Sequence, residues 1–251
     1  MTFPTRNSTE PSTESTECQH CHGAGWVIGS TGALVRCGAC ADFAAESGLT
    51  TSELATTAES IKGKTDLQVV LRWLVNDVTS NPFGWITLFG SYGTAKSMAA
   101  MAIAANMVRA KMPVRYYHAR RLEELWLADT RGQTDNASFL RTYPALVIDE
   151  TDKLNTGSDW MRKGLQELAD ARYRSGRMGN TLTVWIVQND PAACLPGDIA
   201  SRMNDGAFYR PWPGERNEFT VQRHSGLYVP GCINTTGTDA RVYAPSIFQR
   251  K

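Results

Sequence analysis

The first strong pattern along the chain is a stripe of apolar residues at the spacing of an α-helix. Its members recur three or four positions apart: Leu67, Val70, Leu71, Leu74 and Val78. Thr65-Asp66 can cap the start of this helix, and we expect it to end before Asn81-Pro82, because proline restricts the preceding residue to extended conformations. The stripe predicts a helix packed on a core, and we assign it no chemistry.

Short apolar runs then alternate with helical patterns. Strand candidates lie at 85–89, 114–117, 145–150 and 183–189, and helix candidates lie at 97–110, 121–131 and 198–203. Near-continuous apolar strands indicate a sheet that is covered on both faces, and functional groups in such sheets lie at the carboxyl ends of the strands. The pattern predicts an α/β fold with a parallel sheet flanked by helices.

The clearest chemical signal lies between the first of these strands and the helix that follows it. A glycine-punctuated loop connects them, made of Gly90, Ser91, Tyr92, Gly93, Thr94, Ala95, Lys96 and Ser97. This order predicts a phosphate-binding loop, because backbone N–H groups at a helix N-terminus bind phosphate oxygens. We expect Lys96 to reach the β- and γ-phosphates of ATP and Ser97 to hold Mg²⁺. The alternative is a chance glycine-rich turn before a core helix.

One position departs from the pattern G-x-x-x-x-G-K-[ST], because Ala95 precedes the lysine. A methyl group costs little there if φ is negative, but it is strained if the loop requires a positive φ. The segment Gly-Thr-Ala-Lys-Ser also resembles the phosphate loop of replicative MCM helicases, which implies that alanine is compatible with an active site.

Polar residues end two of the other strands. We expect Asp149 to hold Mg²⁺ through water and Glu150 to accept a proton from the attacking water. Asn189 can orient that water, because an amide both donates and accepts hydrogen bonds. The alternative for each is a plain turn residue. Arg202 follows on a short helix, either as a surface charge or as an arginine finger for a neighbouring subunit's γ-phosphate.

Four cysteines have the spacing of a zinc ribbon: Cys18, Cys21, Cys37 and Cys40. The residues between the two pairs read as a small hairpin, and a segment this short needs a metal to fold. The alternatives are two disulfides or free thiols, and His20 or His22 can replace a thiol. Cys194 and Cys232 stand alone, and we expect them to be buried or inert.

Composition limits the remaining choices. The chain has 251 residues, 42% of them hydrophobic, which is enough for one α/β core and a small appendage. A net charge of +1 identifies no partner, so any contact with nucleic acid must come from a local patch. Residues 1–17 are rich in Ser, Thr, Glu and Pro, and we expect them to be disordered. The chain has neither an apolar run of membrane-spanning length nor an apolar leader, which indicates a cytoplasmic protein.

A local basic patch is offered by the second strand candidate and the helix that follows it. Its arginines, with Tyr116, Tyr117 and Trp126 interleaved, are Arg115, Arg120, Arg121 and Arg131. They supply phosphate contacts and stacking surfaces for single-stranded DNA. The alternative is that the tyrosines are core residues and the arginines a solvated face.

Four motifs together resemble the AAA+ ATPases of the bacterial and phage helicase-loader family, which is DnaC/DnaI-like and has IstB-like transposition relatives. They are the loop at 90–97, the Ile-Asp-Glu motif at 148–150, the segment 170–189 and the helix at 199–203, within a match from about 67 to 214. Some phage loader-like proteins are also similar in carrying an N-terminal Cys-x-x-Cys ribbon with a Gly-Trp after the first cysteine pair, as Gly25-Trp26 does here.

The resemblance implies a five-stranded parallel sheet, hydrolysis of Mg-ATP between subunits, and a homo-oligomeric ring or spiral on single-stranded DNA. The family's phosphate, magnesium, base, sensor and finger roles fall on Lys96, Ser97, Asp149, Glu150, Asn189 and Arg202. It implies no C-terminal helical lid, since only 49 residues follow Arg202. We divide the chain into a tail (1–17), a zinc ribbon (18–41), a linker and pocket edge (42–64), an ATPase core (65–220) and a C-terminal extension (221–251).

Three functions remain open at this point. The favoured one is an ATP-dependent loader that binds a replicative helicase through its ribbon region. The second is an ATPase partner of a transposase. The third is an adaptor that binds nucleotide without turning it over, which the alanine before Lys96 suggests.

Overall fold

The computed structural model describes residues 18, 20, 26–28, 34–39, 41–132, 134–204, 208–223 and 226–236. Two compact units make up the chain, Met1–Asp42 and Phe43–Lys251. In the first unit, β1 (Trp26–Ile28) pairs antiparallel with β2 (Leu34–Arg36), which confirms the hairpin expected between the cysteine pairs. The predicted tail at 1–17 lies outside the described residues.

The second unit begins with short helical segments in the range predicted as a linker. These are α1 (Phe43–Ser47), α2 (Thr51–Leu54) and the 3-10 helix η1 (Ala58–Ser60). Helix α3 (Asp66–Ser80) follows, and its start is capped because the Gln68 side chain accepts a 2.9 Å hydrogen bond from the Thr65 backbone N–H. The predicted helix and its end before Asn81 are both confirmed.

In the described part of the chain the larger sheet has five parallel strands in the order β10-β3-β6-β5-β4. They are β3 (Gly84–Phe89), β4 (Val114–His118), β5 (Ala145–Asp149), β6 (Leu182–Val187) and β10 (Cys232–Asn234). The helical segments between them are α4 (Lys96–Arg109), α5 (Ala119–Thr130), α6 (Asn136–Thr142), η2 (Thr151–Lys153), α7 (Asp159–Arg177), α8 (Pro191–Cys194) and α9 (Gly197–Asn204). The predicted α/β fold with a five-stranded parallel sheet is confirmed.

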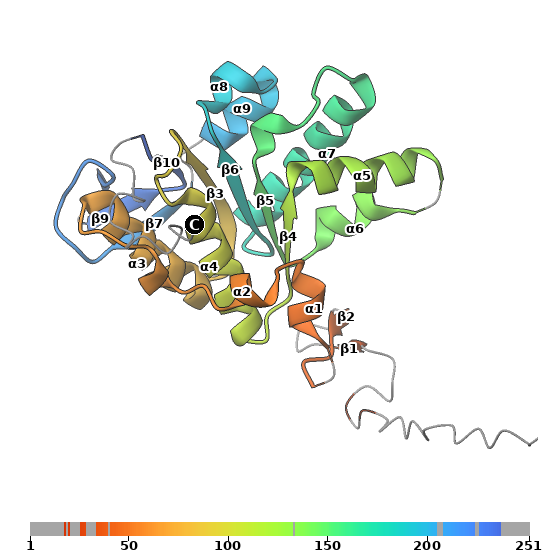
Figure 1. The fold of residues 1–251 in the computed structure, drawn as a ribbon, viewed down its shortest axis with the longest axis horizontal. Coiled ribbons are helices and arrows are strands. Elements are labelled where there is room, and N and C mark those ends of the chain that lie inside the picture. The colour runs from red at the N-terminus through yellow and green to blue at the C-terminus, as the bar shows by residue number, and fades with distance from the viewer. Residues whose placement is uncertain are drawn as a thin grey trace, which may run out of the picture. The chain divides into compact units, whose positions relative to one another are not determined.

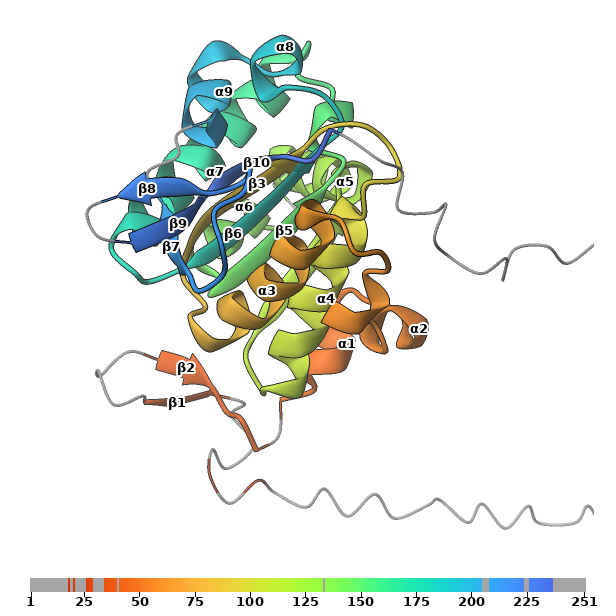
Figure 2. The same ribbon diagram turned by 90° about the vertical axis from the view of Figure 1, so that its left-hand side faces the viewer.

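Helices cover both faces of this sheet (Figures 1 and 2). Helices α3 and α4 pack on one face, where Leu71, Leu74 and Ile103 are fully buried. Helices α5, α7 and α9 cover the other face, where Trp85 and Trp185 lie at the centre of a second cluster. Burial on both sides explains why the strands read as continuous apolar runs.

Arg172 of α7 holds the second face together. Its guanidinium is fully buried and donates to the backbone oxygens of Leu140, Tyr143 and Leu182 and to the Thr183 hydroxyl. Burial lowers the pKa of Arg172 to about 9, so the side chain remains charged at neutral pH. Helix α7 is thereby fixed to α6 and to the start of β6.

The fifth strand comes from the range predicted as a C-terminal extension. Between α9 and β10 the chain forms a three-stranded antiparallel sheet of β7 (Tyr209–Trp212), β8 (Val221–Arg223) and β9 (Gly226–Pro230), in the order β7-β9-β8. The chain then turns at Gly231, whose backbone oxygen accepts a 2.7 Å hydrogen bond from the Thr87 N–H. An added Cβ at Gly231 would lie 2.7 Å from the backbone oxygen of Trp85, so glycine is required at this crossing.

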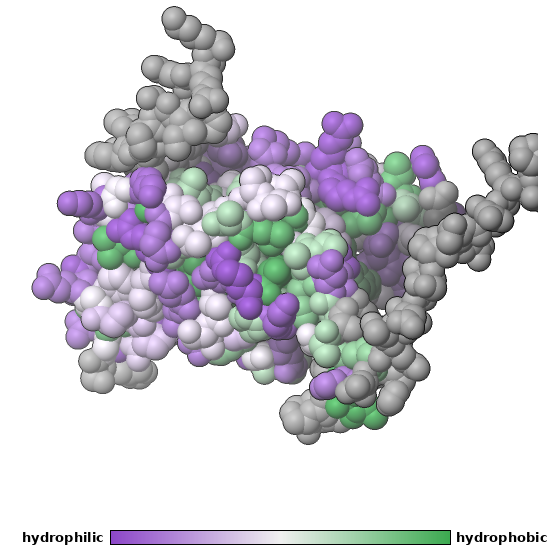
Figure 3. All heavy atoms as spheres, turned by 60° about the horizontal axis from the view of Figure 1, so that its bottom comes forward, coloured by the Kyte–Doolittle hydropathy of each residue, from purple (hydrophilic) through white to green (hydrophobic). Residues whose placement is uncertain are grey.

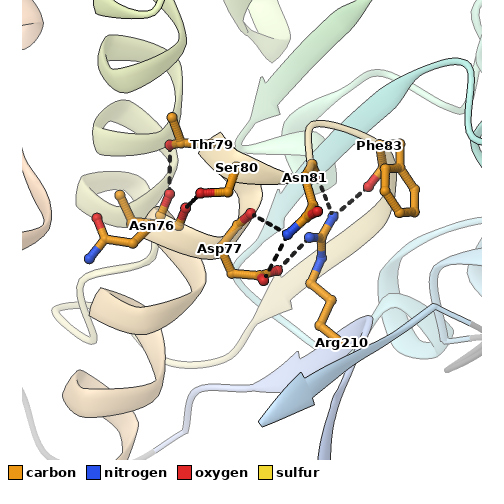
Figure 4. A network of polar contacts seen from close by, with 8 residues as sticks. Asn76, Asp77, Thr79, Ser80, Asn81, Phe83 and Arg210 are labelled. Carbon is orange, nitrogen blue, oxygen red and sulfur yellow. Dashed lines mark hydrogen bonds and ion pairs between the residues drawn. The ribbon is translucent and has the colours of Figure 1, made fainter. Parts of the chain in front are cut away.

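The small sheet is anchored to the core by Arg210 (Figure 4). The guanidinium of Arg210 bonds to the Asp77 carboxylate at 2.5 Å and donates to the backbone oxygens of Asn81 and Phe83. Both charged side chains are largely buried, so removing one of them would leave the other as an unpaired buried charge. The Arg210 contacts fix β7 to the end of α3 and the start of β3.

On the face drawn in Figure 3, groups of hydrophobic residues alternate with hydrophilic ones. Large apolar side chains that are exposed include Phe83, between α3 and β3, and Trp160 and Met178, at opposite ends of α7. Among the described helices, none is long and apolar enough to cross a membrane.

Candidate nucleotide-binding site

The predicted site residues emerge from one edge of the larger sheet, because its strands are parallel. The register pairs Phe89 with Val187, and Ile148 with Trp185 two residues earlier on β6. The loop after β3, the two acids after Ile148 and the amides after Val187 therefore leave the sheet on the same side.

In the loop between β3 and α4, glycines occupy positions with a positive φ, where other residues are strained. Gly90 has a φ of +129° and Gly93 a φ of +78°. An added Cβ at Gly90 would lie 2.6 Å from the backbone nitrogen of Thr236, which belongs to the segment after β10. The loop ends at Lys96, the first residue of α4, so the N-terminus of a long helix faces its interior.

Ala95 adopts the left-handed conformation, with a φ of +69° and a ψ of +17°. The alanine is therefore strained where the usual glycine is not, at a cost of about 1 kcal/mol. Its methyl group packs against the core on the α4 face, which offsets part of the strain.

Lys96 lies inside the loop. Its Nζ donates to the backbone oxygens of Gly90 at 2.7 Å and Ser91 at 2.6 Å, and the residue is only 4% exposed. Burial lowers the pKa of Lys96, and the negative charges of Asp149 and Asp152 oppose this shift. The charged form of Lys96 is thus disfavoured by its burial and favoured by the acids after β5.

Asp149 is buried and held by two donors. The Tyr116 hydroxyl donates to Oδ2 at 2.6 Å, and the backbone N–H of Glu150 donates to Oδ1 at 2.8 Å. Burial raises the pKa of Tyr116, and the Asp149 charge raises it further, so the phenol stays protonated and acts as the donor. Sequence reasoning placed Tyr116 among DNA-stacking or core residues and missed this role.

Glu150 stands at a strained turn directly after the strand. Its φ is +59°, and its carboxylate forms an ion pair with Lys153, one turn further along η2. The hydrogen bond from Lys153 raises the pKa of that lysine. Both side chains are partly exposed, so the pair is weak and can open.

Asp152 is a site residue that sequence reasoning missed. Its Oδ1 accepts a 3.1 Å hydrogen bond from the backbone N–H of Gln188, at the end of β6. This bond joins the turn after β5 to the strand that leads to Asn189. The available signal was a third acid within four residues of the strand end.

Asn189 and Arg202 differ in their surroundings. Asn189 is exposed beyond the end of β6. Arg202 is half-buried on α9, where it bonds to the Asp170 carboxylate at 2.6 Å and donates to the backbone oxygen of Asp198. The arginine expected to be exposed is thus paired within its own chain.

Two threonines connect the loop to the C-terminal strand. The hydroxyls of Thr94 and Thr235 lie 2.8 Å apart, and both residues are fully buried. Thr235 also donates to the backbone oxygen of Phe89 through its N–H and its hydroxyl. The segment after β10 therefore braces the phosphate loop, which a sequence pattern cannot reveal.

The four candidate DNA-binding arginines are not equivalent. Arg115 pairs with Glu46 and lies over the rings of Phe139 and Tyr143, whereas three are exposed: Arg120, Arg121 and Arg131. Glu124 pairs with Arg120 and Arg121. Tyr116 and Trp126 are at most 4% exposed, so neither offers a ring face for base stacking.

Two of the four predicted zinc ligands lie within the described residues. The sulfurs of Cys18 and Cys37 are 3.7 Å apart. Two thiolates on a tetrahedral Zn²⁺ with bonds of about 2.3 Å lie about 3.8 Å apart, whereas a disulfide requires about 2 Å. Cys21 and Cys40 lie outside the described residues.

The two cysteines outside the predicted ribbon, Cys194 and Cys232, have raised pKa values. Burial raises the pKa of Cys194 to about 11 and that of Cys232 to about 12, which makes both thiols poor nucleophiles.

These residues fit a magnesium nucleotide. The helix N-terminus, the positive-φ glycines and the buried ammonium of Lys96 match the charge and shape of phosphate groups. Asp149 and Ser97 carry oxygen atoms of the kind that Mg²⁺ prefers and would be its ligands in such a site.

No protein-family model matches this chain, and no curated protein matches it. Among solved structures it is similar to the DnaC helicase loader, with a TM-score of 0.52 and 16% identity over 61% of this chain and 94% of that chain. The crystal structure of DnaI gives a TM-score of 0.51 and 14% identity, over 62% and 90% of the two chains.

The replication initiator DnaA bound to AMPPCP and single-stranded DNA gives a TM-score of 0.51 and 15% identity, over 62% of this chain. The match spans about half of the DnaA chain, 48%. At these identities the similarity concerns the fold. The chain has an α/β fold, with a five-stranded parallel sheet flanked by helices, that resembles those of DnaA, DnaC and DnaI.

Proposed function

We propose that this protein is a magnesium-dependent ATPase that acts in DNA replication as a helicase loader. The observation that carries the ATPase is the burial of the Lys96 ammonium in a helix-terminal loop, within electrostatic reach of Asp149. The fold shared with the DnaC helicase loader and DnaI supports the replication role.

In this proposal the loop from Gly90 to Ser97 wraps the phosphates of ATP. The Lys96 ammonium leaves the loop carbonyls for phosphate oxygens, which attract it more strongly because they are charged. Ser97 and Asp149 hold Mg²⁺, which neutralises charge on the phosphates. The buried hydroxyl of Tyr116 keeps the Asp149 carboxylate in one orientation.

Glu150 accepts the proton of the attacking water and must first separate from Lys153. Asn189, exposed at the neighbouring strand end, orients that water. Arg202 reaches the γ-phosphate of an adjacent subunit once it leaves Asp170. Subunits arranged in a ring or spiral satisfy this requirement, and the exposed arginines of α5, Arg120 and Arg121, then contact single-stranded DNA.

In this proposal the N-terminal unit binds the partner protein on which the ATPase acts. We propose that Cys18, Cys21, Cys37 and Cys40 hold one structural Zn²⁺ and that this ribbon binds a replicative helicase. The 3.7 Å separation of the Cys18 and Cys37 sulfurs supports the metal site.

A second candidate is a nucleotide-binding adaptor with little hydrolysis. Two observations favour it: the strained φ of Ala95 within the loop, and the ion pair that occupies the Glu150 carboxylate.

Single-turnover hydrolysis of ATP separates these candidates. With the full chain, single-stranded DNA and Mg²⁺, Glu150→Gln should abolish hydrolysis while ATP binding persists, and the exposed control Glu215→Gln should leave both unchanged. An unmodified protein that binds ATP but does not hydrolyse it under these conditions is an adaptor. Transfer of a hexameric replicative helicase onto closed circular single-stranded DNA tests the loader role, and stimulation of a transposase instead of this transfer would identify the IstB-like alternative.

A further inference from the structure

Strands β9 and β10 follow one another along the chain but belong to different sheets. Only Gly231 separates them, so the chain passes from the small sheet to the edge of the larger one (Figures 1 and 2). A Cβ on Gly231 would lie 2.7 Å from the backbone oxygen of Trp85 in β3 and 2.9 Å from that of Phe208, just before β7. Strands β3 and β7 therefore lie on the same side of this run.

The opposite side of the run is filled only in part. Beside β9 it holds β8, where Val221 pairs with Tyr228. Toward β10 this strand gives way to a turn at 217–220, which is closed by a 3.0 Å hydrogen bond from the Asn217 N–H to the Thr220 hydroxyl. Beside β10 no described strand lies on this side, because β10 is the end strand of the larger sheet.

A pocket of about 340 Å³ lies next to β10 on this side. Glu218, Phe219 and Val221 line it from the turn and from β8, and Cys232 and Asn234 line it from β10. The pocket therefore lies where a neighbouring strand would continue the line of β8.

The backbone of β10 presents hydrogen-bonding groups to this side. Gly231 and Thr235 both bond to β3, and the residues that bond to one neighbour alternate along a parallel strand. The N–H and C=O groups of Cys232 and Asn234 therefore face away from β3, where no described strand lies. Such an edge can pair with an extended segment of another chain.

The lining of the pocket indicates which segment fits. Phe219 and Val221 are partly exposed, and a large apolar side chain can pack against them. Among the described residues that line the pocket, Glu218 alone carries a formal charge, which favours a lysine or arginine in the ligand. Because alternate side chains of a strand point the same way, one extended peptide reaches both places with residues two positions apart.

We propose that the free edge of β10 binds an extended segment of a partner protein, which pairs with β10 as an additional strand of the larger sheet. A large apolar residue of this segment packs against Phe219 and Val221, and a basic residue two positions away contacts Glu218. The inference does not rest on nucleotide binding, because Thr235 and Thr236 separate the pocket from the phosphate loop.

Fluorescence anisotropy of the full chain with a labelled synthetic peptide tests the proposal. The probe has the central sequence Thr-Phe-Val-Arg-Thr, and two further probes carry N-methyl groups on one or the other set of alternate backbone nitrogens. Only one edge of the peptide pairs with β10, so one methylated probe should keep its affinity and the other should lose it.

Variants of the chain test the same pairing. Asn234→Pro removes an N–H that faces the pocket and leaves the bonds to β3 in place. It should weaken binding of the unmethylated probe at least about fivefold, whereas Asn234→Ala keeps the N–H and should bind like the unmodified chain. Glu218→Gln should weaken binding about threefold, and the control Glu215→Gln, an exposed acid outside the lining of the pocket, should not.

Circular dichroism confirms that each variant folds, and the methylated probes decide the matter if Asn234→Pro does not. Equal affinities for the two methylated probes, or for Asn234→Pro and Asn234→Ala, would overturn the inference, as would failure of the unmodified chain to bind the first probe. Self-association that Asn234→Pro abolishes, without peptide binding, would overturn it in favour of a second copy of the chain. Each of these results leaves the binding of Mg-ATP, and with it the proposed function, untouched.

Discussion

The hydroxyl of Tyr116 donates a 2.6 Å hydrogen bond to Oδ2 of Asp149, although the two residues lie 33 positions apart in the chain. The register explains the contact: Tyr116 pairs with Val147, and Asp149 faces the same side of the sheet two residues later. A neutral donor thus fixes the carboxylate proposed to hold the metal.

Tyr116→Phe should destabilise the protein by about 2 kcal/mol, because it leaves one oxygen of a buried carboxylate without its donor. The melting temperature should fall by about 5 °C for a unit of this size. Tyr117→Phe is the matched control, since neighbouring residues of a strand face opposite sides. Equal melting temperatures for the two variants would show that the hydrogen bond does not support Asp149.

Ala95→Gly should leave stability unchanged or raise it by up to about 1 kcal/mol, since relief of the left-handed strain opposes the loss of a packed methyl group. Ala99→Gly, in the buried interior of the same helix, should instead cost about 1 kcal/mol or more. Urea unfolding of both variants measures the contrast. A cost for Ala95→Gly as large as that for Ala99→Gly would contradict the strain at Ala95.

Asp170→Asn should raise ATP hydrolysis by the assembled protein up to about fivefold, because a partly exposed ion pair is worth at most about 1 kcal/mol. Arg202→Ala should lower hydrolysis about a thousandfold or more if this arginine acts on a neighbour's phosphate. Arg162→Ala removes an exposed arginine of α7 and should have no effect. Unchanged hydrolysis in Arg202→Ala would make the residue only the structural partner of Asp170.

The purified full chain should contain about one zinc ion, which is released as the four ribbon cysteines are titrated with a thiol reagent. Cys37→Ser should lower the zinc content, and Cys194→Ser should not, because that thiol lies far along the chain on α8. Metal analysis of both variants decides the point. Absence of zinc in the unmodified chain would favour the disulfide or free-thiol alternatives.

The helices and strands of the core could be predicted because burial on both faces of a sheet leaves long apolar runs. Helix α3 also carries its own start signal at Thr65 and its stop signal before Pro82. The edge at which Lys96, Asp149 and Asn189 gather follows from parallel strand order, so their grouping was predictable from the same pattern.

Other features depend on contacts that no local pattern encodes. Strand β10 has three residues and reads as an irregular segment until it pairs with β3. Thr235 and Tyr116 each act through a partner far away in the sequence, at Thr94 and Asp149. The φ of Ala95 depends on how the whole loop closes, which is why its sign could not be predicted from the residue type.

In the proposed function the loop before α4 and the acids after β5 bind one magnesium nucleotide. The most direct test of this binding is calorimetric titration of Mg-ATP into the full chain and into Lys96→Ala, with the exposed Lys163→Ala as control and circular dichroism to confirm folding. Only Lys96→Ala should weaken the binding of Mg-ATP, by at least about tenfold. Equal affinity in Lys96→Ala and the unmodified chain would contradict the proposed function.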